Sequence, residues 1–413
     1  MVQFEVRDKT IAMVSISTTG ARSILSGALF GASLTAAGVY SPTVIISQMK
    51  LESFHMLKVF LSASATSAAV FLLAHRLSPT LAPPRQASSL SLFPYDGNLI
   101  GGLLLGIGMA LTGACPGTVL PQVVTGYQSG RFAFVGAIIG AIIYSKIRPF
   151  IRTQATCSAP TVPDAKPTLY QKLDPKADEI KAVYIYQNFC WGIILLASWL
   201  SKDQVQSLLT PTWGGICIGC AQGASLWLTE NTLGASSAYE QLGDLFWSGV
   251  ERLRVGDVVS DSSKRAEKVY GNRNANGYLN GNGHLNGNGN GATKPPLRHP
   301  STARPSIRGN FFTFGILLGS YLLSRTMTLP TPLPITSLGK PNLNISELST
   351  SSMPSIPIPR AILGGIAMVL GARIAGGCTS GHGISGMSLL SVSSIISVCA
   401  MFGGGIFWGV VVG

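Results

Sequence analysis

The chain has 413 residues and a formal net charge of +13, yet only 11% of its residues are charged and its mean hydropathy is +0.36. A soluble globular protein carries roughly 25% charged residues, so this composition excludes a soluble enzyme, a disordered chain and a coiled coil. A basic balance can indicate nucleic-acid binding, but here the charges are concentrated in a few loops without interleaved aromatic residues. The pattern predicts a multi-pass integral membrane protein embedded in a lipid bilayer, with no nucleic-acid partner.

Charge-free windows mark the expected membrane helices in chain order. A helix needs about 20 mostly apolar residues to cross the hydrocarbon core, so the windows predict roughly seven to ten membrane segments. Residues 22–40 also resemble a secretory signal, but the apolar run continues past Gly38, which favours a membrane helix. The windows lie between Arg22 and Lys50, Lys58 and Arg76, Asp96 and Arg131, Lys181 and Lys202, Asp203 and Glu230, across 309–324, and from Ile374 onward.

Two polar segments carry most of the basic excess. Residues 146–182 hold seven Lys/Arg against four acids, and residues 251–308 hold ten against four. The positive-inside rule places both on the cytoplasmic side, and we expect the plasma membrane rather than an organelle membrane. From Gly271 to Gly291, 15 of 21 residues are Asn or Gly; such a run buries too little apolar surface to offset its ordering entropy, which predicts a disordered linker over 258–308.

These features divide the chain into six expected parts. They are an N-terminal tail (1–22), membrane half 1 (23–147), a basic cytoplasmic loop (148–182), the first part of membrane half 2 (183–250), a basic Asn/Gly-rich linker (251–308), and the second part of half 2 (309–413).

A repeated glycine and cysteine pattern indicates that the two halves are related. The pattern G-G-x5-G-x4-G-x-C runs from Gly101 to Cys115 and again from Gly364 to Cys378, at a constant offset of 263 residues. Small residues let membrane helices approach closely, which explains the glycines but not the aligned cysteines. Repeated halves are common in transporters, whose substrate site lies where the repeats meet. A weaker repetition pairs Gly27 and Gly31 with Gly215 and Gly219.

The residues around each cysteine predict a break in a membrane helix. Pro lacks a backbone N–H and Gly loosens the backbone, so we expect each helix to end just after its cysteine. Non-helical backbone at membrane depth persists only inside protein or along a cavity, and its freed amides can hold an anion without a formal charge. A soft thiol suits a sulfur-containing ligand. The expected path residues are Gly113, Cys115, Pro116, Gly117 and Thr118, and Gly377, Cys378, Thr379, Ser380, Gly381, His382 and Gly383.

The segments Gly-Ala-Cys-Pro-Gly-Thr (113–118) and Gly-Gly-Cys-Thr-Ser-Gly-His-Gly-Ile-Ser-Gly (376–386) resemble the signature loops of the YeeE/YedE-type sulfur-transport membrane proteins. The resemblance implies an all-α protein with two pseudo-symmetric halves, whose broken or re-entrant helices meet centrally. It also implies uptake of thiosulfate or a related sulfur compound, which Cys115 and Cys378 would pass inward through transient S–H···S contacts. The family pattern has a further cysteine near the start of the first repeat, where this chain has Tyr40 and Ser41.

Other residues are open to more than one interpretation. Cys217 and Cys220 form a C-x-x-C inside an apolar window, compatible with packing, with lining of the path, or with redox or metal chemistry. Arg373 lies in an apolar segment, where an ionisable residue indicates function by default; the alternatives are snorkelling or an ion pair with Glu230 or Glu240. His382 can donate to an anion or bind backbone carbonyls.

Two classes of function fit these residues. The first is a permease for thiosulfate or another small sulfur-containing anion, with neutral thiols as weak-binding stations and neither cofactor nor metal. The second is a membrane-embedded sulfurtransferase or thiol oxidoreductase that forms a persulfide, which needs a base beside its cysteine; only His382 near Cys378 offers one. No catalytic triad, P-loop or Rossmann fingerprint occurs, so we expect a transporter rather than an enzyme.

Overall fold

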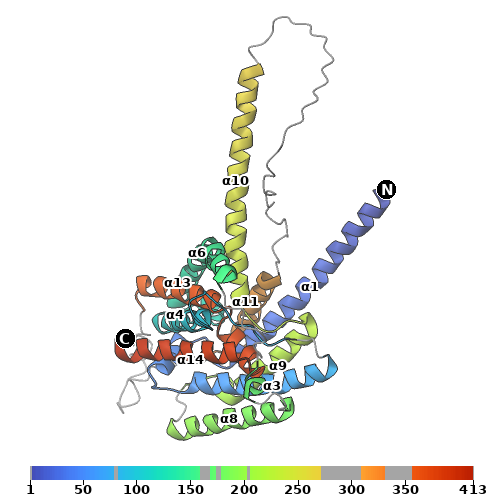
Figure 1. Cartoon of the computed structure of the whole chain (residues 1–413). Coiled ribbons are helices and arrows are strands. Elements are labelled where there is room, and N and C mark those ends of the chain that lie inside the picture. The colour runs from blue at the N-terminus through green and yellow to red at the C-terminus, as the bar shows by residue number, and fades with distance from the viewer. Residues whose placement is uncertain are drawn as a thin grey trace, which may run out of the picture. The chain divides into compact units, whose positions relative to one another are not determined.

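A computed structural model describes residues 2–78, 82–158, 168–173, 178–201, 205–270, 308–330 and 356–412. These residues form helices and connecting turns with no β-strand, which confirms the expected all-α class. The chain divides into a main unit, Met1–Gly243 with Ile307–Gly413, and a second unit, Asp244–Ser306. Figure 1 labels the helices of the main unit.

The helices of the first half are α1 (Val2–Ala36), α2 (Pro42–Met49), α3 (His55–Leu77), α4 (Asp96–Thr112), α5 (Val119–Val124) and α6 (Gln128–Ser158). The remaining helices are α7 (Leu169–Leu173), α8 (Glu179–Leu200), α9 (Pro211–Thr229), α10 (Ser236–Tyr270), α11 (Arg308–Thr326), α13 (Ile358–Ile374), the π-helical segment η2 (Thr379–Gly386), α14 (Val392–Phe407) and η3 (Trp408–Val412).

Fewer uninterrupted spans are present than the charge-free windows suggested. Within the described ranges, four stretches are long and apolar enough to cross a membrane, or five if α13 and η2, bent by 43°, count as one span; the four are α3, Gln128–Ile151, α8 and Val392–Val412. The expectation of roughly seven to ten treated each window as a straight helix of about 20 residues. α4 and α13 are only 17 residues long, because each is followed by a non-helical turn.

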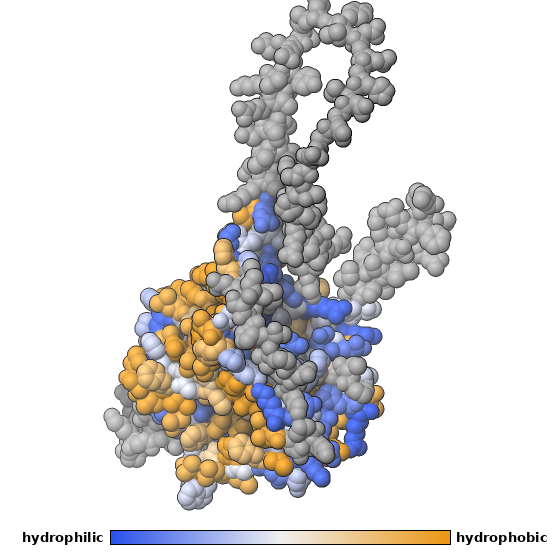
Figure 2. Space-filling view, viewed as in Figure 1, coloured by the Kyte–Doolittle hydropathy of each residue, from blue (hydrophilic) through white to orange (hydrophobic). Residues whose placement is uncertain are grey.

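Large hydrophobic side chains on the surface are consistent with a lipid-facing exterior. Most of α8 is exposed, including Tyr184, Phe189 and Trp199. In Figure 2 hydrophobic residues gather over much of the visible face of the main unit. Exposed apolar area on this scale is unusual for a soluble protein, and together with the candidate spans it identifies a multi-pass membrane protein.

The expected linker begins later than the sequence suggested. α10 runs without interruption to Tyr270, so residues 258–270 are helical rather than disordered. Between Asp244 and Tyr270 the chain contains no proline and many helix-forming residues such as Glu, Arg and Lys, and the helix ends where the Asn/Gly run begins at Gly271. The rest of the expected linker lies outside the described residues.

The packing of the helices repeats between the two halves. In the first half α4 packs against α14, α1 against α11, and α5 against α6 and α11. In the second half the equivalent pairs are α13 with α6, α9 with α3, and η2 with α14 and α3. Exchanging α1 with α9, α3 with α11, α4 with α13, α5 with η2 and α6 with α14 converts each set into the other, which is the arrangement expected of two pseudo-symmetric halves.

The repeated glycines lie where α4 crosses α13, and their contacts are reciprocal. A Cβ added to Gly108 would approach the carbonyl oxygen of Gly364 to 2.7 Å, and one added to Gly371 would approach that of Gly101 to 2.6 Å. Gly108 and Gly371 are repeat partners, as are Gly101 and Gly364. A contact that maps onto itself in this way is the signature of a twofold relation. Because early residues of one helix meet late residues of the other, α4 and α13 are antiparallel and the pseudo-twofold axis is perpendicular to them.

The glycines of the weaker repetition also lie where two helices pack closely. Added Cβ atoms at Gly27 and Gly31 would collide with the backbone of α11, and one at Gly215 would collide with the backbone of α3. These glycines therefore permit the close α1–α11 and α9–α3 pairs that the two halves share.

Candidate functional site

The two cysteine loops begin with the same backbone turn. α4 ends at Thr112 and α13 ends at Ile374, and the repeat partners Gly113 (φ +62°) and Gly376 (φ +82°) follow in the left-handed conformation. Each helix thus ends before its cysteine, and the expectation of an end just after it was wrong. The left-handed glycine, which costs a non-glycine residue about 1–2 kcal/mol, stops the helix two residues before the cysteine.

Cys115 is held by its own short loop. The backbone N–H and the hydroxyl of Thr118 both donate to Cys115 Sγ at 3.3 Å, while the N–H of Cys115 donates to Thr118 Oγ1 at 2.8 Å. From the other half of the chain, the Tyr239 hydroxyl donates to the carbonyl oxygen of Pro116 at 2.9 Å. The loop is therefore ordered although its backbone is not helical, and the thiol is 6% exposed.

Cys378 lies in a longer and more extensively bonded loop. It is 1% exposed, its Sγ lies 3.3 Å from Ser380 Oγ, and the backbone N–H of Gly381 also bonds to the thiol. The backbone and hydroxyl of Ser236, the first residue of α10, supply two more bonds. The Thr379 hydroxyl contacts the sulfur atoms of Met109 (3.5 Å) and Met401 (3.4 Å). Soft sulfur atoms and small hydroxyls therefore surround the second cysteine.

A cavity joins the two loops. Cys115 lines it together with Thr379 and Ser380, the neighbours of Cys378, so the fold brings together two loops whose cysteines are 263 positions apart in the sequence. No charged side chain lines the cavity. Its lining residues are Phe30, Leu34 and Val39 near the end of α1; Met56, Val59, Phe60 and Ala63 of α3; Cys115, Gly117 and Thr118; Ile218 of α9; and Thr379, Ser380 and Ile384 of the second loop.

His382 and Gly383 are buried within the second loop. His382 Nδ1 lies 3.0 Å from Ser394 Oγ, and its Nε2 lies 3.1 Å from the carbonyl oxygen of Ala375. Of the two interpretations of His382, the structure shows the bond to a backbone carbonyl, and neither ring nitrogen is left to act as a base for Cys378. Gly383 lies against the ring of Phe60, and its carbonyl oxygen accepts from Ser64 at 3.1 Å, which fixes the loop against α3.

Tyr40 and Ser41 lie beside the cavity rather than on it. The Tyr40 hydroxyl donates to the carbonyl oxygen of Pro330 at 3.3 Å, and its ring packs 6.0 Å from that of Tyr127. Ser41 Oγ bonds to Thr43 Oγ1 at 2.7 Å. Their neighbour Val39 is the residue of this segment that lines the cavity.

The C-x-x-C pair is likewise off the cavity. Cys217 is half-buried and Cys220 is exposed on α9, and both are free thiols, whereas Ile218 between them lines the cavity. Within the described part of the chain no group of three or more His, Cys, Asp or Glu residues could hold a metal ion. Neither thiol lines the cavity, and the packing and redox interpretations of this pair stay predictions.

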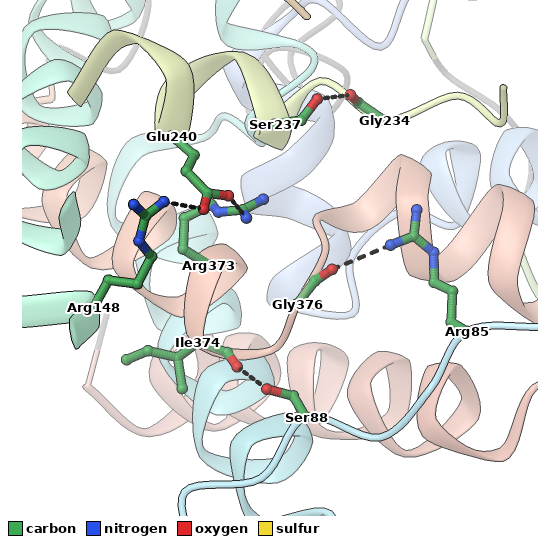
Figure 3. Close-up of polar contacts among 9 residues, drawn as sticks. All are labelled: Arg85, Ser88, Arg148, Gly234, Ser237, Glu240, Arg373, Ile374 and Gly376. Atoms are coloured by element: carbon green, nitrogen blue, oxygen red, sulfur yellow. Dashed lines mark hydrogen bonds and ion pairs between the residues drawn. The ribbon is translucent and has the colours of Figure 1, made fainter. Parts of the chain in front are cut away.

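Arg373 forms an ion pair with Glu240 at the end of α13, one of the two carboxylates considered from the sequence. Glu240 also pairs with Arg148 of α6 at 2.7 Å, and the Arg373 guanidinium lies 5.7 Å from the Tyr144 ring centroid. Figure 3 shows Glu240 between the two arginines. The side chains are 9–31% exposed, and the cluster ties α6, α10 and α13 together beside the second loop.

Sequence reasoning missed three residues that hold the loops, namely Ser236, Tyr239 and Arg85. Ser236 is the first residue of α10 and belongs to neither cysteine motif. Tyr239 follows one turn later on α10, where nothing in the spacing distinguishes it. Arg85 lies in a polar connection between two charge-free windows, and its side chain reaches the carbonyl oxygen of Gly376 at 3.1 Å.

A helical membrane protein whose repeated halves direct two broken helices to one cavity has the architecture of a secondary transporter. A family model for sulphur transport matches residues 36–332 and 335–407, which include both cysteine loops. The chain therefore belongs to the YeeE/YedE sulphur transport family. A comparison with curated proteins finds no match.

Proposed function

We propose that the protein carries thiosulfate, or a closely related small sulfur-containing anion, across the membrane through the cavity between the two cysteine loops. The observation that carries this proposal is the shared cavity, which has Cys115 on one side and Thr379 and Ser380, the neighbours of Cys378, on the other. Membership of the sulphur transport family supports a sulfur compound as the substrate.

The chemistry of the lining suits passage rather than storage. A conducting site must bind strongly enough for entry and weakly enough for release. Thiols and hydroxyls are weak, neutral donors, and the cavity itself has no charged lining residue. Cys115 and Cys378 thus act as successive stations, each donating its S–H to the anion while the bonds around it rearrange.

The antiparallel crossing of α4 and α13 supports opposite access to the two stations. The helices end at opposite ends of the crossing, and each cysteine loop turns back toward the cavity from its own end. An anion entering at one membrane face therefore meets one cysteine loop first and leaves past the other.

We also propose that both basic segments face the cytoplasm at the plasma membrane. The Arg148–Glu240 pair supports placement on one face, because it joins α6 and α10 near where those segments begin. Thr168, in the first basic segment, pairs with Ser391 after the second loop, so in the proposed orientation the Cys378 end would also face the cytoplasm. A pH-sensitive fluorescent protein inserted after Gly271 should respond to cytosolic and not external acidification; the opposite response would contradict this orientation.

The direct test is uptake of labelled thiosulfate by proteoliposomes. Wild type should show flux, while Cys115→Ser and Cys378→Ser should lose most of it and remain folded. Cys220→Ser is the matched control, because Cys220 is a free, exposed cysteine away from the cavity, and it should transport normally. Unchanged flux in both loop variants would sink the proposed path. A stable persulfide on either cysteine after turnover, detected by mass spectrometry, would instead favour the sulfurtransferase alternative.

A further inference from the structure

The connection between α3 and α4 covers the second cysteine loop. The carbonyl oxygen of Arg85 accepts hydrogen bonds from the hydroxyls of Ser391 (2.8 Å) and Ser393 (2.9 Å). Ser88 donates to the carbonyl oxygen of Ile374 at 2.6 Å, and its own N–H donates to Asn98 at 2.8 Å. The backbone on both sides of the loop is therefore fixed to this connection, which gives the Arg85 side chain a defined starting point.

The guanidinium of Arg85 lies directly on the backbone of the loop. Its Nη1 donates to the carbonyl oxygen of Gly376 at 3.1 Å, as Figure 3 shows. A Cβ at Gly377 would come within 2.9 Å of Nη1, and one at Gly381 within 2.9 Å of Nη2. Glycine at these two positions is what allows the cation to approach the residues on either side of Cys378.

Most of the donor capacity of Arg85 is unused within the described part of the chain. A guanidinium carries five N–H donors, and among the described residues Arg85 makes one side-chain hydrogen bond, to the neutral carbonyl of Gly376. Within the described residues no carboxylate pairs with it, whereas Arg373 and Arg148 share Glu240. The residue is half-buried, so it remains reachable from one side. His382 cannot substitute for it, because both of its ring nitrogens are engaged.

We propose that Arg85 and the Gly376–Gly381 backbone form an anion-binding site that takes the oxygen end of the transported anion while its sulfur lies toward Cys378. This inference rests on the proposed function and specifies its substrate class, which is a small anion with both a soft sulfur and oxyanion oxygens. The forked N–H groups of arginine match such oxygens, and the thiol matches the sulfur. An anion that has only one of these ends fills only half of the site.

The site has no equivalent at the first loop. Cys115 is surrounded by Thr118 and by the Tyr239–Pro116 bond, and the cavity beside it is uncharged. The anion thus moves from a neutral station to one beside a cation, and the difference gives the path a preferred resting place at the Cys378 end.

Two measurements on purified full-length protein test this assignment. In proteoliposomes, Arg85→Gln should raise the KM for thiosulfate by about tenfold or more, as expected from loss of a charge-assisted hydrogen bond. The control is Arg76→Gln, an exposed arginine at the end of α3, which should keep the wild-type KM. In detergent, millimolar thiosulfate should raise the melting temperature of wild type and of Arg76→Gln but not of Arg85→Gln.

The two measurements separate this inference from the proposed function. Absence of thiosulfate flux in wild type would overturn the transport proposal, whereas a wild-type KM and wild-type thermal shift in Arg85→Gln would overturn only the role of Arg85. If Arg85→Gln does not fold, Arg85→Lys serves instead, because lysine keeps the charge but not the fork. A severalfold higher KM in Arg85→Lys supports the site, and an unchanged KM contradicts it.

Discussion

The two cysteine loops follow equivalent helices but differ in the residues that stabilise them. Each follows an antiparallel, glycine-packed helix that ends at a left-handed glycine, Gly113 or Gly376, two residues before the cysteine. The first loop is short and is stabilised chiefly by Thr118. The second continues into η2 and is contacted by Ser236, by Arg85 and, through Arg373, by a charged cluster. The repeat therefore specifies where the two loops lie, and residues outside the repeat determine which side chains contact each loop.

The two arginines near the second loop, Arg373 and Arg85, differ in whether a carboxylate pairs with them. Arg373 replaces Ala110 of the first half, but its charge is paired with Glu240. Arg85 comes from a connection with no role in the repeat, and it retains unused donors. Arg373, a charge inside an apolar window, was the more conspicuous signal in the sequence, yet Arg85 in the connection between α3 and α4 is the residue that we propose contacts the anion.

The largest effect should come from breaking the Arg148–Glu240–Arg373 cluster beside the second loop. Glu240→Ala leaves Arg373 and Arg148 together without a carboxylate, which should cost about 3 kcal/mol of stability because partly buried like charges then face each other. Thermal unfolding of the detergent-purified protein measures this. Glu251→Ala, an exposed acid further along α10, is the control; equal melting temperatures for the two variants would show that the cluster is dispensable.

The glycine crossing offers a test of equivalence between the halves. Gly108→Ala and Gly371→Ala each place a Cβ against the opposite helix backbone, and each should cost about 2 kcal/mol by overpacking. Gly403→Ala, whose Cβ meets nothing within 4 Å, should be neutral. Costs for Gly108 and Gly371 that differ by more than about 1 kcal/mol would contradict the twofold relation, since the reciprocal contacts predict equal values.

The left-handed glycines should distinguish the loops. Alanine at either position loses about 1 kcal/mol from its backbone conformation. At Gly113 the new Cβ would also approach Pro42 to 2.8 Å, whereas at Gly376 the nearest atom is 3.7 Å away. Gly113→Ala should therefore lower the melting temperature more than Gly376→Ala. The reverse order would indicate that the second loop, not the first, is the more constrained.

The smallest expected effect concerns the bond that Tyr239 of the second half makes to the first loop. Tyr239→Phe removes the hydroxyl that donates to Pro116 and should cost about 1 kcal/mol. Tyr184→Phe changes an exposed tyrosine of α8 and should have no effect. A Tyr239→Phe protein as stable as wild type would mean that bonds from the first half, such as those made by Thr118 and by Gln122, suffice to order the first loop.

Patterns that recur along the sequence predicted the structure well. Contacts made once, between residues far apart in the sequence, could not be predicted. The glycines at a constant offset predicted the related halves, and the charge-free windows predicted membrane helices. The helix breaks were predicted, but their positions were not. Pro116 indicated a break after Cys115, whereas the helices end earlier because Gly113 and Gly376 adopt the left-handed conformation. Tyr239, Ser236 and Arg85 act through contacts with residues more than 100 positions away, and no local pattern encodes such contacts. The C-x-x-C was conspicuous in sequence, yet its two thiols lie off the cavity.

The crossing of α4 and α13 has a consequence for how the protein moves. At Gly101, Gly108 and Gly371 an added Cβ would meet the backbone of the opposite helix, so the two helices touch without an intervening layer of large side chains. We expect this close crossing to resist rocking of one half against the other. For the transport proposed above, we then expect displacement to be concentrated in the short cysteine loops, because loop motions are faster than rigid-body domain motions. We expect movement of the anion past the cysteine loops, rather than slow rocking of the two halves, to limit the rate of turnover.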